Sequence, residues 1–197
     1  MKKLIVIILL CYFQPYLSAA QTEDRWYTLT IGTKPAGYYY ETITSSDSTV
    51  TNQNEMNIRI SRLGSETVMD VKQFATEDRR GNLKNITSEL LYSKQLNTSK
   101  VIILPGVIRI TNQAGGKQST HDLPYSGTLT GSEGIRLLTI ANLKKIGDSI
   151  SYQLFFPEFS MISTGKRKFI GVEDIMLNGT HIKAKRVKES FAGLPTM

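Results

Sequence analysis

The feature that most limits the fold of this chain is a series of short runs in which apolar and polar residues alternate. In the clearest run, residues 56–63, Met56, Ile58 and Ile60 lie on one side of an extended chain and polar residues lie on the other. A turn signal, Gly64-Ser65, ends it. A side-chain period of two is that of a β-strand with one buried and one solvated face. Strands joined by short turns predict an antiparallel meander.

Similar runs recur along the chain. The turn between the last two contains Asn178-Gly179, a strong hairpin signal because both residues tolerate a positive φ. A slip of the alternation at Lys185-Arg186 suggests a β-bulge. Residues 111–131 have few large apolar side chains and predict a loop or a weak hairpin. The strand-like runs are Trp26–Ile31, Tyr38–Thr44, Met56–Leu63, Thr67–Ala75, Leu83–Leu91, Ser149–Phe156, Lys168–Leu177 and Thr180–Lys188.

Helical periodicity is found once after the first twenty residues, and it predicts a helix at 132–145. Gly131 or Ser132 would cap its start, and Glu133 suits the positive end of the helix dipole. Lys144 and Lys145 suit the negative end, and Gly147-Asp148 would stop the helix. Leu137, Leu138 and Ile140 are its candidate core residues.

Residues 1–20 have the order of a secretory signal peptide. Lys2 and Lys3 precede an apolar run that ends near Phe13, and small residues follow at 18–20. The apolar run is about half as long as a bilayer-spanning helix requires, so cleavage after Ala20 is favoured over a retained anchor. We therefore expect an exported protein, in the periplasm or outside the cell.

Cleavage would remove Cys11, the chain's single cysteine, so the remaining 177 of 197 residues would hold no disulfide and no thiolate. Loss of Lys2 and Lys3 lowers the formal net charge from +7 to +5. The remaining basic residues are spread over predicted strands and form no recognition motif, so no nucleic-acid partner is expected. A chain of this length can bury a core without covalent staples, and residues 21–197 are predicted to form a single β-rich domain.

The candidate chemical residues have ordinary structural explanations. Neighbouring residues of a strand point to opposite faces, so His121 and Asp122 do not predict an orienting pair, and His181 is expected to face solvent. Ser132 lies in a motif that is one residue too short for the hydrolase elbow G-x-S-x-G, and a helix cap is favoured. The same reasoning treats other residues as incidental or structural: the acids Glu77, Asp78, Glu173 and Asp174, the sequons at Asn85, Asn97 and Asn178, and the aromatic triplet Tyr38-Tyr39-Tyr40. No catalytic, cofactor or metal site is predicted.

Several short motifs resemble the β-rich region that precedes a transglutaminase-like domain in exported bacterial proteins. The resemblance extends from Trp26 to Leu194 and also fits the β-clam of periplasmic lipoprotein carriers. It implies that the catalytic Cys, His and Asp of that family lie beyond Met197, so no residue here takes those roles. The motifs are Trp26-Tyr27, Gly32-x-Lys34-x-x-Gly37-Tyr38 with Glu41, Leu143–Asp148 before Tyr152 and Phe156-Pro157, Gly171-Val172-Glu173, Asn178-Gly179 and Lys183-Ala184.

Together these observations predict a mainly β (α+β) fold, a curved antiparallel sheet of the β-clam or half-barrel type with one central helix near 132–145. The abrupt end at residues 193–197 suggests a sequence that continues. The first functional hypothesis is a non-catalytic accessory domain that packs against its own downstream domain. The alternative is a periplasmic carrier that binds a lipid or an apolar peptide on the concave face of the sheet. A free-standing enzyme lacks a convergent catalytic set.

Overall fold

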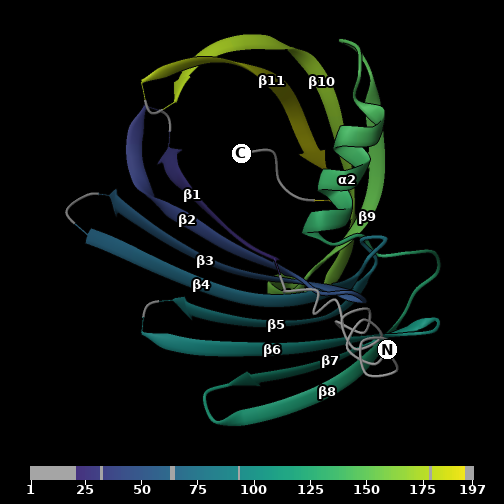
Figure 1. The fold of residues 1–197 in the computed structure, drawn as a ribbon. Coiled ribbons are helices and arrows are strands. Elements are labelled where there is room, and N and C mark those ends of the chain that lie inside the picture. The colour runs from purple at the N-terminus through teal and green to yellow at the C-terminus, as the bar shows by residue number, and fades with distance from the viewer. Residues whose placement is uncertain (1–20, 32, 63–64, 93, 178, 194–197) are drawn as a thin grey trace, which may run out of the picture.

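The computed structural model describes residues 21–31, 33–62, 65–92, 94–177 and 179–193 (Figure 1). The predicted signal peptide, Asn178 of the predicted turn and residues 194–197 lie outside the described residues. The elements are β1 (Gln21–Ile31), β2 (Lys34–Ser45), β3 (Thr49–Arg62), β4 (Ser65–Asp78), β5 (Leu83–Tyr92), β6 (Gln95–Leu104), β7 (Val107–Ala114), β8 (Lys117–Pro124), α2 (Ser132–Asn142), β9 (Ser149–Phe156), the 3-10 turn η1 (Pro157–Phe159), β10 (Met161–Leu177) and β11 (Thr180–Phe191).

The strands form two antiparallel sheets. β1 to β8 pair in sequence order as an eight-stranded meander, and β9, β10 and β11 form a second sheet in which β10 is central. In Figure 1 the large sheet bends upward at β1 and β2, while β10 and β11 arch over it from the side of α2 and β9. The large sheet is curved but not closed, because β1 and β8 are its two edges. The predicted curved antiparallel sheet with one helix is therefore confirmed.

Two hydrophobic clusters hold these layers together. The first joins the large sheet to β9, where Phe155 packs among the branched side chains of β5 to β7. The second joins α2 to the small sheet and includes Leu143, which is fully buried after the end of the helix. Ile135 and Leu138 of α2 pack against this second cluster. The helix thus fills part of the space between the two sheets.

The start of α2 is fixed by a side chain from β4. Both carboxylate oxygens of Glu77 accept backbone hydrogen bonds, from the amide of Glu133 at 3.1 Å and from that of Gly134 at 3.0 Å. These amides belong to the first turn, where a helix has unpaired donors. Gly131 is the N-cap residue, and no side-chain cap bond forms there. The predicted position of the cap is confirmed, but its acceptor comes from a distant strand.

The helix ends earlier than predicted. It stops at Asn142, so Lys144 and Lys145 lie in the following turn and not in the last helical turn. The Asp148 carboxylate accepts the backbone amides of both lysines, at 2.8 and 2.6 Å. These bonds favour a turn over another helical turn.

Three sequence-based predictions about strands have clear outcomes. Residues 111–131 are predicted to form a loop or a weak hairpin, and the hairpin alternative is correct for their first part: β7 and β8 pair around Gly115-Gly116, both at positive φ. The β10–β11 hairpin is confirmed, and its bulge lies at the predicted level. The extra residue, however, is Ile170 on β10, because Phe169 pairs with Val187 and Gly171 with Arg186. Alternation on β11 could not reveal which strand carries the insertion.

Substitution of Leu138 tests the packing of the helix. Leu138 contacts the second cluster, whereas its neighbour Leu137 is 38% exposed. We expect Leu138→Asp to lower the free energy of unfolding by about 2 kcal/mol, since it buries part of an unpaired carboxylate. Leu137→Asp is the control and should change it by less than about 0.5 kcal/mol. Equal effects in urea denaturation would contradict this packing.

Candidate binding surface on the concave face

The side chains of the large sheet separate into two faces. Residues that pair across antiparallel strands share a face, and alternate residues of a strand lie on opposite faces. Ile86, Val101 and Ile110 pair in one row, and Phe155 of β9 packs on them. This row therefore marks the concave face, on which β9 and α2 lie.

Two further rows of the concave face are rich in apolar side chains that β9 does not cover. The first pairs Tyr27, Tyr39, Met56, Val71 and Leu90 across β1 to β5, and the second pairs Leu29, Gly37, Ile58, Met69 and Tyr92. Most of these side chains are half-buried, and Tyr27 and Tyr92 are 47% and 48% exposed. We call the eight large apolar side chains of these rows that are incompletely buried the apolar concave surface: Tyr27, Leu29, Tyr39, Met56, Ile58, Met69, Leu90 and Tyr92.

Aromatic pairs lie on both faces of β1 and β2. On the concave side the rings of Tyr27 and Tyr39 lie 5.5 Å apart, and burial raises the pKa of Tyr39. On the convex side Trp26 lies over Tyr40 with ring centroids 4.2 Å apart and contacts Tyr38 at 5.8 Å. The aromatic triplet is thus divided between the faces, as strand alternation predicts.

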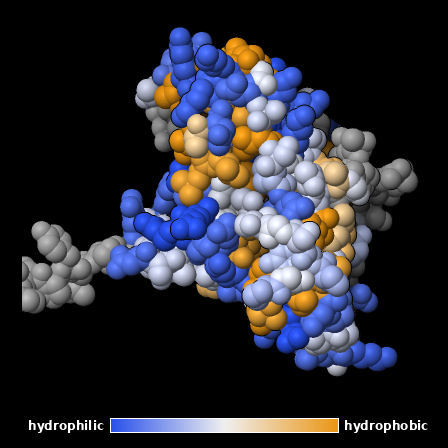
Figure 2. Space-filling view, turned by 90° about the vertical axis from the view of Figure 1, so that its right-hand side faces the viewer, coloured by the Kyte–Doolittle hydropathy of each residue, from blue (hydrophilic) through white to orange (hydrophobic). Residues whose placement is uncertain are grey.

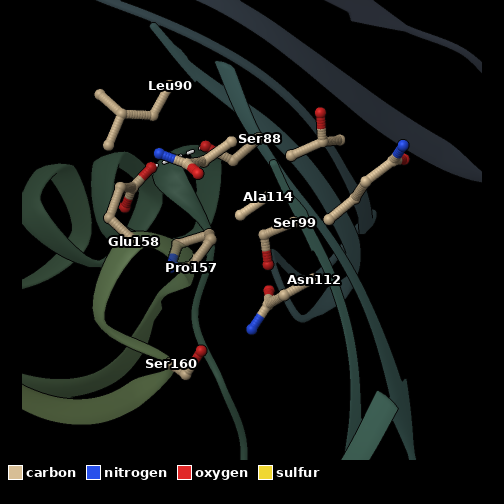
Figure 3. A pocket seen from close by; sticks show the side chains of 11 residues that line it. Ser88, Leu90, Ser99, Asn112, Ala114, Pro157, Glu158 and Ser160 are labelled. Carbon is tan, nitrogen blue, oxygen red and sulfur yellow. Dashed lines mark hydrogen bonds between the residues drawn. The ribbon is translucent and has the colours of Figure 1, made fainter. Parts of the chain in front are cut away.

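The turn η1 stands on the concave face beside the apolar concave surface. One carboxylate oxygen of Glu158 accepts hydrogen bonds from Gln73 Nε2 at 2.6 Å and Ser88 Oγ at 2.7 Å. Figure 3 shows Glu158 beside Ser88. Gln73 and Ser88 pair across β4 and β5 in the row between the hydrophobic core and the apolar rows. These bonds anchor η1, which carries Phe159 with 64% of its surface exposed.

The helix does not complete a solid core. Leu137 and Ile140, predicted core residues of α2, are 38% and 53% exposed. They lie on one side of the helix, opposite the side that packs on β9 and β10. Figure 2, which shows the face that carries α2 and β9, has a hydrophobic patch in its upper half and further hydrophobic groups below it. The expectation that all three helix residues fill the core is therefore wrong for Leu137 and Ile140.

The histidines are not brought together with acids. His121 and Asp122 pair with Ile110 and Arg109 in different rows, and Asp122 binds the Arg109 guanidinium through two contacts of 2.9 Å on the convex face. That guanidinium lowers the pKa of Asp122. His181 is exposed on β11. Within the described ranges, no three His, Cys, Asp or Glu side chains gather as a metal site would require.

The remaining candidate residues are structural or exposed. Ser132 is the exposed first residue of α2, and Glu173 and Asp174 are exposed on β10. Asp78 holds the β4–β5 turn, where it accepts the amides of Arg80 and Asn82 at 2.9 and 3.0 Å. Sequence reasoning considered Glu77 but missed its role at the start of α2, where it is fully buried. Its sequence signal was only a carboxylate near the end of an alternating strand.

None of the helices that the structure describes combines the length and the apolar character needed to cross a bilayer.

Comparison with known proteins supports the fold. No family model matches the chain, and a search of curated proteins also finds no match. A similar solved structure is the crystal structure of a beta-barrel-like protein of domain of unknown function DUF1849 from Brucella abortus. It superposes with a TM-score of 0.60 over 88% of this chain and 79% of that chain, at 11% sequence identity. The likeness supports a β-rich domain, and nothing in these comparisons connects the chain to transglutaminase-like proteins.

Proposed function

We propose that this protein is an exported, non-catalytic binding module that holds an acyl chain or an apolar peptide on the apolar concave surface. The observation that carries the proposal is the incomplete burial of that surface, in which Tyr27 and Tyr92 are about half exposed. Its eight residues come from β1 to β5, lie in two adjacent rows and remain incompletely buried in the folded chain. Contiguous exposed apolar side chains on a concave face are characteristic of ligand or partner sites.

The ligand class follows from the chemistry of these rows. Leu, Ile and Met supply flexible or branched apolar contacts, and the Tyr27–Tyr39 pair supplies ring faces. Two rows of side chains cannot enclose a ligand. An acyl chain or an extended peptide that lies across the five strands would, however, contact several of these side chains at once. Burial of apolar area contributes about 25 cal/mol per Å², so a ligand that buries a few hundred Å² gains several kcal/mol.

The binding of a fluorescent fatty acid tests the proposed function. We expect the double variant Tyr27→Ser/Tyr92→Ser to raise the Kd about tenfold, since it removes two large exposed rings from the surface. Trp26→Ser is the matched control, because Trp26 is 68% exposed on the convex side of the same strand as Tyr27. It should change the Kd by less than about twofold. Failure of the unchanged protein to bind, or equal losses in both variants, would refute the proposal.

An accessory domain is the second candidate function, and one observation favours it. Trp26, Tyr38 and Tyr40 form an aromatic patch on the convex face, and Trp26 is largely exposed. Such a patch suits docking of another domain, as aromatic side chains are enriched in interfaces. The sequence of the gene beyond Met197 tests this candidate. A stop codon at that point, with no following domain, would remove it.

A further inference from the structure

The β10–β11 hairpin carries most of the protein's net positive charge. Residues 161–191 contain seven Lys or Arg and three Asp or Glu, which gives a formal net charge of +4. In Figure 1 this hairpin forms the upper arch of the molecule, and β5 to β8 lie at the lower end. The net charge of the chain is therefore concentrated at one end of the fold.

Two cations of the small sheet have partners within the protein. They lie on the side that faces α2, which Phe169 marks because it belongs to the hydrophobic cluster under the helix. Arg167 forms an ion pair with Glu189 at 2.9 Å. Lys185 donates to the backbone carbonyl of Leu143 at 2.8 Å, and its Nζ lies 5.3 Å from the centre of the Phe169 ring. These two cations thus stabilise the fold.

Four other cations lie on the opposite face of the same two strands. Lys168 pairs directly across from Lys188, and Lys166 and Arg186 lie in the neighbouring rows of that face. We call these four residues the basic hairpin face. All four are exposed, and none forms an ion pair within the described residues. Because like charges directly opposite one another destabilise a sheet, the stability of the fold does not explain this arrangement.

The surroundings of the basic hairpin face favour several anions in one plane. Ser149 and Ser151 of β9 pair with Lys168 and Lys166 and add exposed hydroxyls to the same rows. Successive rows on one face of a strand are about 7 Å apart. Glu173, at the border toward the hairpin end, is the acid of this face among the described residues. Cations spread over three rows can meet several anionic groups at once, which a single small anion cannot provide.

Apolar side chains lie on the same face toward the end of the hairpin. Ile175 pairs with Ile182, and each is 37% exposed. Among its described residues this face has no exposed aromatic ring, on which the bases of a nucleic acid could stack. Cations next to exposed aliphatic side chains match the order of groups in a bilayer, where the phosphates lie outside the acyl chains.

We propose that the basic hairpin face docks the protein on the surface of an anionic phospholipid bilayer. The four cations bind lipid phosphates, the hydroxyls of Ser149 and Ser151 donate to the same headgroups, and Ile175 and Ile182 contact the boundary with the acyl chains. The docking uses none of the side chains of the apolar concave surface. It therefore holds whether or not that surface binds an acyl chain.

Sedimentation with lipid vesicles tests the proposal. The protein is used without residues 1–20, whose apolar run would bind lipid by itself, and every described strand follows them. We expect vesicles of equal parts phosphatidylglycerol and phosphatidylcholine to bind it at least about tenfold more tightly than phosphatidylcholine alone. NaCl at about 0.5 M should remove most of this difference, because it screens exposed charges.

The double variant Lys168→Gln/Lys188→Gln should lower the affinity for the anionic vesicles at least about tenfold, since each cation near such a surface contributes about fivefold. Its melting temperature should stay unchanged or rise, because a like-charge pair is removed. Lys100→Gln/Lys117→Gln is the matched control. It removes the same charge from exposed positions on β6 and β8, at the other end of the molecule, and should change the affinity by less than about twofold (Figure 1).

The double variant Ile175→Ser/Ile182→Ser tests the apolar part of the contact. It should weaken vesicle binding several-fold and leave the dependence on salt unchanged, because no charge is altered. An unchanged affinity would contradict the stated arrangement.

Three results would overturn the proposal as a whole. The first is equal binding, or none, to the two kinds of vesicle. The second is an equal loss of affinity in the two lysine variants, since the effect would then come from net charge alone. The third is equally tight binding of a single-stranded oligonucleotide, because the face would then recognise charge without a bilayer.

Discussion

Replacement of Gly81 by alanine is expected to lower the free energy of unfolding by about 4 kcal/mol. Gly81 lies in the β4–β5 turn with φ of +82°, and a Cβ placed there would be 2.1 Å from the Cα of Gly134 in α2. The obstacle is backbone on both sides, so no side-chain rotation relieves it. The amide of Gly131 also donates to the Gly81 carbonyl at 3.0 Å, which ties the turn to the start of the helix. Urea denaturation followed by circular dichroism measures the loss.

The variant Gly116→Ala is the control that separates the two costs of Gly81→Ala, the strain of a positive φ and the clash of the new Cβ with α2. Gly116 has a similar φ of +75°, but nothing lies within 4 Å of the position that its Cβ would take. We expect this control to cost only about 1 kcal/mol, the penalty for an alanine in the left-handed region. A similar loss in both variants would show that the turn and helix separate at little cost, contrary to the contacts described.

The stability of the protein is expected to fall by about 3 kcal/mol as the pH rises from about 4.5 to about 8. The cause is Glu77, whose burial raises its pKa from 4.5 to about 7, against the opposing effect of the hydrogen bonds from Gly134 and Glu133. In this window the folded protein binds a proton that the unfolded chain has released. The stabilisation is therefore complete below about pH 4.5 and is lost as the pH rises through about 7.

Glu77→Gln is the variant that tests the origin of this dependence. Glutamine has the shape of the protonated side chain but does not titrate, so its stability curve should be nearly flat over the same window. The pKa values of Asp78, Asp122 and Asp148 are all lowered in the folded protein. Titration of these three carboxylates therefore changes the stability at more acid pH and does not contribute to the slope above pH 4.5. A slope that persists in Glu77→Gln would assign the dependence to another group.

Much of the fold could be predicted, because a strand with one face in solvent alternates polar and apolar residues along the sequence. Met56 and Ile58 alternate with Asn57 and Arg59, and the structure places the apolar pair on the concave face. The turn at Gly179 was marked by residue types that accept a positive φ. The end of α2 could not be predicted, because it depends on a carboxylate from Asp148 that competes with helical hydrogen bonds.

The candidate sites were much harder to predict from the sequence. Glu77 lies 56 residues before Glu133, and its role as the helix cap follows from tertiary contact alone. The hydrogen bonds from Gln73 and Ser88 to Glu158 likewise depend on tertiary contact, and no local motif indicates that η1 would stand over β5. The alternation of polar and apolar residues predicts on which face of the sheet each side chain lies. It does not predict which part of the concave face β9 and α2 leave uncovered.

The open edges of the two sheets have a consequence for the behaviour of the protein at high concentration. Because β1, β8 and β11 each pair on one side only, their free backbone groups could serve as templates for strands of other molecules. β11 carries Lys183, Lys185, Arg186 and Lys188, and an added copy of this strand would bring these cations into mutual repulsion. Charge along this border therefore protects against fibril-like stacking, and that protection should weaken as salt is added.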